Sequence, residues 1–242
     1  MYLPCCYLFV SFVYFQVGWE IAHSQETLIR STMTRTEVLR DVAENQENCI
    51  CSGQWLDCAL EILLKNGIDI TCFATSVYQL LLNGRGKYRN LMICGPANCG
   101  KTFMFQALTT IYNTFTNPAT GTFAWVGAEV VEVIFLNDFR WSPKIIPWHD
   151  MLLLLEGQPV HLPAPKTHFE HDITFDKQTP IFCTAKQPLV YISGGAVDER
   201  ETEMMSVRWK MFSFSHQIPH DKQKDVKPCG YCFAHLVLDN KE

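Results

Sequence analysis

One stretch of eight residues constrains the fold of this chain more than any other feature. Its residues are Gly95, Pro96, Ala97, Asn98, Cys99, Gly100, Lys101 and Thr102. A glycine, four variable residues, a second glycine, a lysine and a hydroxyl residue form the Walker A pattern. The stretch follows an apolar run and precedes a predicted helix, which is the context that the pattern requires. This context disfavours the alternative, a glycine-rich turn that matches by chance.

The residue types in this stretch suit a chain of phosphates. Gly95 and Gly100 leave room for successive backbone N–H groups to point at one phosphate chain. The start of the following helix adds the positive end of its dipole. Lys101 is placed to reach the outer phosphates, and the Thr102 hydroxyl can ligate the Mg²⁺ that bridges them. We therefore predict that residues 95–102 bind ATP and Mg²⁺.

Apolar patterning around this stretch predicts an α/β fold. Helices are expected at residues 54–66, 71–82 and 101–115, and short buried strands at residues 90–94, 123–126, 131–136 and 180–184. Alternation over 160–175, where prolines interrupt any helix, predicts a hairpin. Strands that alternate with helices indicate a parallel sheet flanked by helices, in the manner of a P-loop NTPase. The ligand is then expected at the carboxyl ends of the strands.

A second apolar run, at residues 133–136, leads into Asn137 and Asp138. An apolar strand that ends in a carboxylate is the Walker B arrangement. A parallel strand beside the P-loop strand would deliver Asp138 to the Mg²⁺ ion. The alternative is an ordinary strand followed by an Asp turn, but a position about forty residues after a P-loop favours the metal role.

Four segments together resemble motifs A, B, B′ and C of superfamily 3 helicases. They are residues 93–102, residues 133–138, residues 154–158 with the hairpin that follows, and residues 179–184. Their order and compact spacing are most similar to the helicase domain of the parvoviral non-structural proteins. The resemblance implies an AAA+ core in a homo-oligomeric ring, usually a hexamer, that moves along single-stranded DNA. It also implies action in the nucleus of the host cell.

The resemblance assigns a DNA contact to Lys166 and His168. Both lie in the stretch similar to the motif B′ hairpin, whose basic tip grips the DNA backbone in this family. A lysine on a phosphate is a salt-sensitive contact. The alternative is a solvated loop, because three neighbouring residues, Glu170, His171 and Asp172, dilute the positive charge.

The resemblance also assigns an arginine finger. Arg208 lies in a segment similar to the one that presents a guanidinium to the ATP of the neighbouring subunit. A surface salt bridge is the alternative role, and Arg200 is the alternative finger. Lys101, Asp138 and Arg208 are therefore the predicted catalytic residues, and Thr102 and Asp138 the predicted Mg²⁺ ligands.

The chain departs from the family pattern at two positions. Many members end motif B with two acidic residues, whereas here Asn137 precedes Asp138. Motif C usually ends with an Asn that positions water, and here Lys186 stands at that place, which leaves Thr184 as the nearest substitute. Two alternatives to a helicase therefore stay open: an oligomer that binds ATP and DNA but hydrolyses slowly, and an ATPase that acts on a protein. No His-hydrophobic-His pair is found, so origin nicking is not expected.

Composition limits the domain organisation and the partners. The chain has 242 residues, 48% of them hydrophobic, which predicts one main domain. Its net charge of -5 gives no global basic field, so any DNA contact must be local. We expect an apolar N-terminus and polar linker at 1–48, a helical lead-in at 49–90, the ATPase core at 91–215 and a tail at 216–242. The uncharged run at 2–19 is interpreted as a packed extension or a chain-boundary artefact rather than a membrane anchor.

The eleven cysteines are interpreted mainly as reduced, buried residues of an intracellular protein. Cys229 and Cys232 form one CxxC pair, and three histidines lie near it in the sequence: His216, His220 and His235. A structural zinc site is one interpretation of this pair. A reduced turn is the favoured one, because structural zinc usually needs two paired sets of ligands.

Overall fold

A five-stranded parallel sheet forms the centre of the protein in the computed structural model, which describes residues 28–118, 123–164 and 173–242. The strand order is β2-β3-β6-β1-β9. The strands span Thr114–Thr116 (β2), Val133–Leu136 (β3), Ile181–Ala185 (β6), Asn90–Cys94 (β1) and Trp209–Ser213 (β9). Strand β6 pairs with both β1 and β3. The expectation that the Walker B strand lies beside the P-loop strand is therefore wrong, because the motif C strand separates them.

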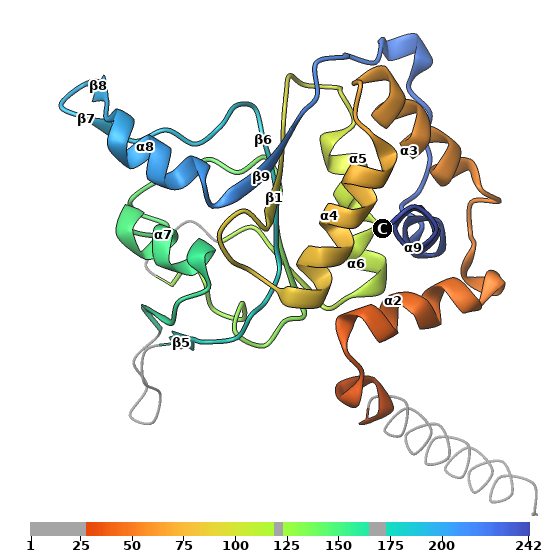
Figure 1. Cartoon of the computed structure of the whole chain (residues 1–242), viewed down its shortest axis with the longest axis horizontal. Helices are drawn as coiled ribbons and strands as arrows, with labels where there is room; N and C mark the ends of the chain where they lie inside the picture. Colours follow the sequence, from red (N-terminus) through yellow and green to blue (C-terminus); the bar gives the residue numbers. More distant parts are fainter. Residues whose placement is uncertain (1–27, 119–122, 165–172) are drawn as a thin grey trace, which may run out of the picture.

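Helices cover both faces of this sheet (Figure 1). One face carries α3 (Gln54–Lys65), α4 (Ile70–Asn83), α5 (Lys101–Gln106), α6 (Leu108–Ile111) and α9 (Gly230–Leu238), with α2 (Arg35–Glu44) beyond them. The other face carries α7 (Trp148–Glu156) and α8 (Glu199–Ser206). Two short 3₁₀ turns, Gln46–Asn48 (η1) and His220–Lys222 (η2), lie in connecting segments. Two separate hydrophobic clusters fill the spaces between the sheet and these two helical layers.

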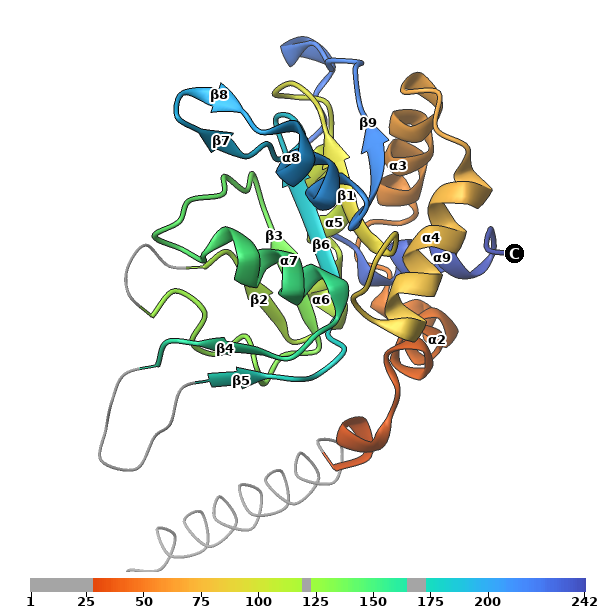
Figure 2. The ribbon, with the colours of Figure 1, turned by 60° about the vertical axis from the view of Figure 1, so that its left-hand side comes forward.

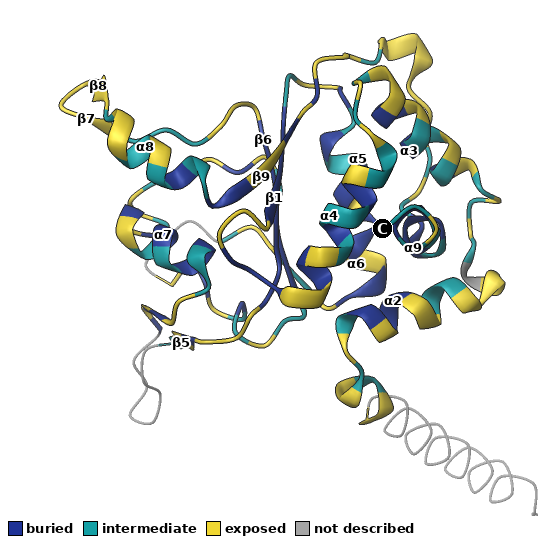
Figure 3. Ribbon diagram, viewed as in Figure 1, coloured by how far each residue is buried: buried dark blue, intermediate teal, exposed yellow. Residues whose placement is uncertain are grey.

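The central strands are apolar on both faces because each face meets a helical layer. Every residue of β1, β3 and β6 is buried. Figure 3 shows these strands in the buried colour, while the outer faces of the helices are exposed. A parallel sheet covered on both sides requires such continuous apolar runs. This requirement explains why the sequence pattern located these strands to within a residue or two.

Two small antiparallel hairpins project from the main body (Figure 2). Val160–Leu162 (β4) pairs with Ile173–Phe175 (β5), which confirms the hairpin predicted over 160–175. Ile192–Ser193 (β7) pairs with Ala196–Val197 (β8) in a second hairpin that the sequence analysis did not anticipate. Its turn is formed by Gly194 and Gly195, both at positive φ, which suits a two-residue hairpin loop.

Two elements differ from the sequence prediction after the Walker A stretch. The helix expected over 101–115 ends at Ile111, and the chain is extended from Tyr112 (φ -118°, ψ 151°) into β2. The run at 123–126, expected as a strand, lies in consecutive turns. Its Trp125 is buried and stacks on Phe115, at a ring-centroid distance of 5.7 Å. The run is apolar because it packs against the sheet, not because it joins it.

The terminal segments belong to the packed structure. Helix α2 lies in the stretch expected to be a linker, and a capping box between Thr34 and Glu37 fixes its start. Its Val38 and Leu39 are buried in the same cluster as α9. Helix α9 lies within the expected tail and contacts α2, α3, α4 and α6. The expectation of a polar linker within 1–48 is therefore corrected for Arg35–Glu44, which is a packed helix.

Arg85 joins the turn after α4 to the other helical layer. Its side chain is fully buried, and it donates hydrogen bonds to four backbone carbonyl oxygens. The acceptors belong to Leu154, Gln158, Phe175 and Lys177, at distances from 2.6 to 3.1 Å. The guanidinium also lies 4.8 Å from the centroid of the Phe175 ring. The base of the β4–β5 hairpin and the end of α7 are thereby tied to the strand that leads into the Walker A stretch.

None of the helices within the described ranges is long and apolar enough to cross a membrane. The run at 2–19 lies outside those ranges.

Candidate functional site

The Walker A stretch forms a loop between β1 and α5, at the carboxyl edge of the sheet. Two of its glycines are required by geometry. A Cβ on Gly95 would lie 2.0 Å from the backbone oxygen of Phe214, which cannot move without disturbing β9. Gly100 has φ 87°, a left-handed conformation that favours glycine, and it is packed against the Ile62 side chain. The sequence-predicted P-loop is therefore present as a loop from strand to helix.

The Lys101 side chain is folded over this loop. Its Nζ donates hydrogen bonds to the backbone oxygens of Gly95 at 2.9 Å and Pro96 at 2.6 Å. Cys99 Sγ lies 3.8 Å from the same nitrogen. The lysine is buried, with only 7% of its surface exposed. The ammonium group is thus held at the loop by oxygen atoms, at the place where a phosphate chain would meet it.

A hydrogen-bond network connects the Walker A helix to the Walker B strand. The Thr102 hydroxyl donates to Asn137 Oδ1 at 2.7 Å, and the Thr184 hydroxyl donates to the same oxygen at 2.9 Å. Thr184 Oγ1 in turn accepts from the backbone N–H of Asp138 at 2.8 Å. The residue that contacts the Thr102 hydroxyl is therefore Asn137 and not the predicted ligand Asp138. Thr184, which the sequence suggested as the water-positioning residue, is fully buried, and its hydroxyl is engaged in this network.

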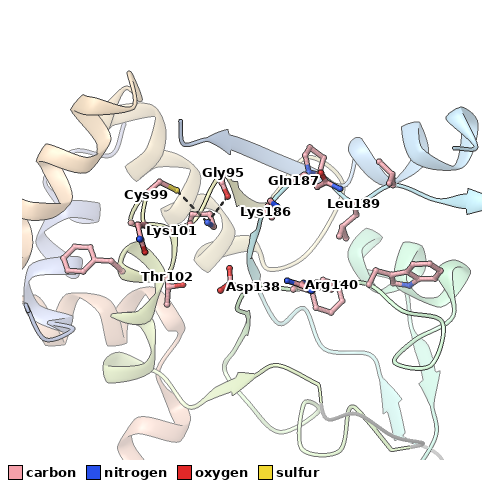
Figure 4. A pocket seen from close by; sticks show the side chains of 17 residues that line it. Gly95, Cys99, Lys101, Thr102, Asp138, Arg140, Lys186, Gln187 and Leu189 are labelled. Atoms are coloured by element: carbon pink, nitrogen blue, oxygen red, sulfur yellow. Dashed lines mark hydrogen bonds between the residues drawn. The ribbon is translucent and has the colours of Figure 1, made fainter. Parts of the chain in front are cut away.

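The side chain of Asp138 points away from this network and lines the pocket. Its φ of 47° is left-handed, which is uncommon for a residue other than glycine and is better tolerated by Asp and Asn. The Phe139 N–H donates to the Thr184 backbone oxygen at 2.8 Å and fixes the turn. Figure 4 shows Asp138 between Thr102 and Lys101 on one side and Lys186 and Arg140 on the other. Asp138 is the only carboxylate among the described residues that line this pocket.

Three polar residues on the far wall of the pocket complete its chemistry. Lys186 and Gln187 follow β6, and Arg140 follows the Asp138 turn. All three are exposed and line the pocket opposite the Walker A loop (Figure 4). Sequence reasoning singled out Lys186 only as a departure and did not identify Arg140 or Gln187. The sequence signal for these residues was their position, since each lies within four residues of the carboxyl end of a parallel strand.

A second, more apolar hollow adjoins the other side of the Walker A loop. It shares Asn98, Cys99, Gly100 and Phe103 with the first pocket. Its remaining walls come from α3 and from the segment after β9, and they are Cys58, Glu61, Ile62, Lys65, Asn66, His216, Ile218, Pro219, Lys222, Gln223 and Lys224. The Ile218 N–H donates to the Asn98 backbone oxygen at 2.7 Å and holds this segment against the loop. The two hollows therefore adjoin each other at these four shared residues.

Arg208 is not presented at the surface. Only 7% of it is exposed, and its guanidinium donates to the backbone oxygens of Leu152 and Met204. It also pairs with Glu156 at 2.6 Å, and Lys87 pairs with the other oxygen of that carboxylate at 2.7 Å. The hydrogen bond from Lys87, together with the charge of Arg208, lowers the pKa of Glu156. The predicted finger is thus engaged in a partly buried ion pair within its own chain, because Arg208, directly before β9, lies against α7.

The remaining predicted residues fall into two groups. Arg200, the alternative finger, is exposed in the first turn of α8. Within the described part of the chain, it has no carboxylate partner. Lys166 and His168 lie outside the described residues. The base of their hairpin is described, and it projects from the layer that carries α7 (Figure 2).

A Walker A loop after β1, an inserted motif C strand and helices on both faces of a parallel sheet define a P-loop NTPase fold. The family model described as parvovirus non-structural protein NS1 matches residues 9–120, which include the Walker A loop. The resemblance to parvoviral non-structural proteins that the motifs suggested is thereby confirmed.

The chain is also similar to solved structures. One of them is JCV helicase bound to an acetamide compound, and the likeness has a TM-score of 0.47 at 14% sequence identity. The likeness covers 83% of this chain and 58% of that one, so the chain spans little more than half the length of that structure. No curated protein matches the chain.

Proposed function

We propose that this chain is an ATP-hydrolysing DNA helicase or translocase of the superfamily 3 type. It would act in the replication of a parvovirus-like genome or of a virus-derived element. The observation that carries the proposal is the convergence of Lys101, Thr102 and Asp138 on one pocket at the carboxyl edge of the sheet. The match to the NS1 family model supports the viral setting, and with it the host-cell nucleus as the place of action.

The residues of the pocket fit a triphosphate with Mg²⁺. When bound, this ion would neutralise charge on the phosphate oxygens. The Thr102 hydroxyl and the Asp138 carboxylate line the pocket and are hard oxygen ligands of the type that Mg²⁺ prefers, and the Asn137 amide oxygen lies 2.7 Å from that hydroxyl. The Lys101 ammonium exchanges its two loop carbonyls for phosphate oxygens, so it needs no new desolvation when the nucleotide enters. The α5 N-terminus and the loop amides complete the phosphate site.

Asp138 is the group proposed to take the proton from the attacking water. It lines the pocket, and its backbone turn is held by Thr184 and Phe139. Lys186 and Arg140 face it and would offset negative charge that develops on the outer phosphate. The second hollow, between α3 and the segment after β9, would receive the nucleobase because its walls are more apolar and adjoin the same loop.

Single-stranded DNA is the proposed partner, contacted by Lys166 and His168, which lie between β4 and β5 in the sequence. A homo-oligomeric ring, usually a hexamer in the family that this chain resembles, would place these hairpins around a central channel. The exposed Arg200 then becomes the better candidate for a finger that reaches the neighbouring subunit, since Arg208 is engaged within its own chain. No membrane contact is proposed.

One observation favours a second candidate function. The oxygen next to the Thr102 hydroxyl belongs to an amide, so this side of the metal site lacks the charge of a carboxylate. A neutral ligand weakens Mg²⁺ binding. The alternative is therefore an oligomer that binds ATP and DNA and hydrolyses slowly.

Steady-state ATP hydrolysis of the full chain, with and without single-stranded DNA, tests the proposal. The Lys101→Met variant keeps the aliphatic stem of the buried lysine and removes its charge together with its two hydrogen bonds to the loop. We expect it to lose at least about 10²-fold in turnover, because the phosphate charge is left uncompensated. Lys144→Ala, at an exposed lysine outside the pocket, is the matched control and should keep full activity.

The outcomes separate the candidate functions. Turnover that DNA stimulates and Lys101→Met abolishes supports the helicase. ATP binding with negligible turnover in both conditions supports the alternative, an oligomer that binds ATP and DNA and hydrolyses slowly. Turnover that depends on Lys101 but not on DNA indicates an ATPase that acts on a protein partner. Normal turnover in Lys101→Met would contradict the whole assignment.

A further inference from the structure

Four cysteines from distant parts of the chain meet at one point beside α9. Cys49 and Cys51 lie in the loop before α3, and Cys229 and Cys232 lie at the start of α9. The four sulfur atoms all lie within 4.8 Å of one another. Cys49 and Cys232 are separated by 183 positions in the sequence. Figure 1 shows α9 between α2 and α3, which brings its first turn to the loop that joins them.

The spacing of the sulfurs suits a single metal ion. A tetrahedral zinc ion with Zn–S bonds of about 2.3 Å requires sulfurs about 3.8 Å apart. Cys49 Sγ lies 3.8 Å from Cys232 Sγ, and Cys51 Sγ lies 3.4 Å from the same atom. A set of four thiols within such a sphere is a complete ligand set for a closed structural site. An ion at their centre would need only small shifts of the side chains.

Backbone N–H groups and a tight turn of the chain lie close to the sulfurs. The Trp55 N–H points at Cys51 Sγ at 3.4 Å, and Cys229 is the N-cap of α9. Ser52 and Gly53 have positive φ, so the chain turns back around Cys51. A helix N-terminus and N–H donors both stabilise thiolates.

The ligand set differs from the one that the sequence suggested. No histidine of the described residues belongs to the cluster. His235 Nδ1 lies 2.9 Å from Asp239 Oδ2, and its Nε2 lies 3.2 Å from the Ala43 backbone oxygen. The second cysteine pair that a zinc site needs is Cys49 and Cys51, which sequence reasoning treated as part of the scattered set. The signal for this pair in the sequence was the C-x-C spacing of Cys49 and Cys51.

We propose that Cys49, Cys51, Cys229 and Cys232 hold one structural zinc ion. The ion pins the start of α9 to the loop before α3 and so closes the helical layer that carries the Walker A loop. Cys229 and Cys232 are 1% and 2% exposed, so the site is closed to water on one side, as suits a structural role. The site is separate from the nucleotide pocket, and its existence does not depend on hydrolysis.

Metal analysis of the full chain, purified under reducing conditions, tests this proposal. We expect about one zinc ion per chain, as for a four-cysteine structural site. Replacement of zinc by cobalt should give the ligand-field bands of a tetrahedral ion and a sulfur-to-cobalt charge-transfer band. A chain without metal that also takes up neither ion overturns the proposal. Iron in place of zinc overturns the choice of ion.

Variants identify the ligands. Cys51→Ser and Cys229→Ser should each lower zinc affinity at least about 100-fold, because each removes one thiolate of the set. Cys58→Ser is the matched control, since Cys58 is half-buried on α3 and lies outside the cluster. Unchanged zinc content in both ligand variants would contradict the assignment. If the variants do not fold, the cobalt spectrum of the unmodified chain still decides.

Disulfide formation is the competing chemistry for sulfurs this close. Intact mass under non-denaturing, non-reducing conditions distinguishes the two states. A mass lower by four hydrogens with no metal indicates two disulfides and overturns the proposal. A mass higher by one zinc ion, corrected for displaced protons, supports it.

Discussion

At the scale of single residues, Asn137 has the most direct consequence for activity. Its amide oxygen accepts hydrogen bonds from the Thr102 and Thr184 hydroxyls, and it supplies no charge. Asn137→Asp places a carboxylate at this point without a change in shape. We expect it to lower the Mg²⁺ concentration for half-maximal hydrolysis by about tenfold, since added ligand charge strengthens binding of a hard cation.

Titration of turnover against Mg²⁺ measures this effect. Asn45→Asp, which adds the same charge at an exposed 3₁₀ N-cap far along the chain, should leave the titration unchanged. Asp138→Asn should instead abolish turnover at every Mg²⁺ concentration, because Asn tolerates the same left-handed backbone but cannot take a proton. An equal or higher Mg²⁺ requirement in Asn137→Asp would contradict the assigned metal position.

Residue roles were predictable only where the local pattern fixes the geometry. The P-loop residues and the pocket position of Asp138 followed from a strand, a motif and a turn that are continuous in sequence. The burial of Arg208 did not follow, because it depends on α7 lying over β9, a contact between distant segments. The meeting of Cys49 with Cys232 has the same cause, since nothing local links positions 183 apart.

At the scale of elements, the ion pair of Arg208 and Glu156 fastens β9 to α7. Arg208→Met should lower the free energy of unfolding by about 2–3 kcal/mol, because it leaves Glu156 with Lys87 alone and removes two bonds to carbonyl oxygens. Denaturant unfolding measures this loss. Arg200→Met, at an exposed arginine of α8, is the control and should stay within about 0.5 kcal/mol of the original chain.

If Arg208 instead acted as an arginine finger on a neighbouring subunit, Arg208→Met would affect turnover rather than stability. Turnover would then fall by about 10³-fold or more while stability stayed unchanged. Stability and turnover measured on the same preparation therefore decide between the buried pair and the finger.

The same ion pair should make stability depend on pH in acid. The pKa of Glu156 is lowered in the folded chain, first by the hydrogen bond from Lys87. Its contribution is therefore complete above the ordinary carboxyl value of 4.5 and is lost as the pH falls through the lower folded value. We expect the difference in unfolding free energy between the original chain and Glu156→Gln to shrink between pH 6 and about pH 3. A difference that stays constant over this range would contradict the role of the charge.

The elements themselves were predictable in proportion to their burial. Strands covered on both faces carry unbroken apolar runs, and β1 and β6 were located from these runs alone. The edge strand β2 was taken for the end of a helix, because it is only half-buried and follows one directly. The turns around Trp125 were taken for a strand, since a short apolar run does not reveal whether it joins a sheet or packs on it.

At the scale of the whole molecule, a ring with a shared active site makes a testable demand on Arg200. Arg200→Ala should lower turnover by about 10³-fold while each subunit still binds ATP. Mixed with Lys101→Met, it should recover activity, because some interfaces combine an intact P-loop with an intact arginine. Turnover measured against mixing ratio should show a maximum at intermediate ratios.

Two controls accompany this experiment. Both variants must assemble and exchange subunits, and Arg40→Ala, at an exposed arginine of α2, should keep full turnover by itself. A flat line at the level of the inactive parents would count against a finger at this position.

The burial of Arg85 has a consequence for the local unfolding of the molecule. Its guanidinium is fully buried and forms no salt bridge within the described ranges, so the four carbonyl oxygens and the Phe175 ring around it offset the cost of desolvation. If one of the segments that supply these oxygens moves away alone, the buried guanidinium loses its hydrogen-bond acceptors. We therefore expect three segments to unfold locally in one cooperative step: the hairpin base, the end of α7 and the entry to β1. Hydrogen exchange in these three segments should then proceed at one common rate. A force applied to the hairpin would be transmitted through Arg85 to the start of the P-loop strand.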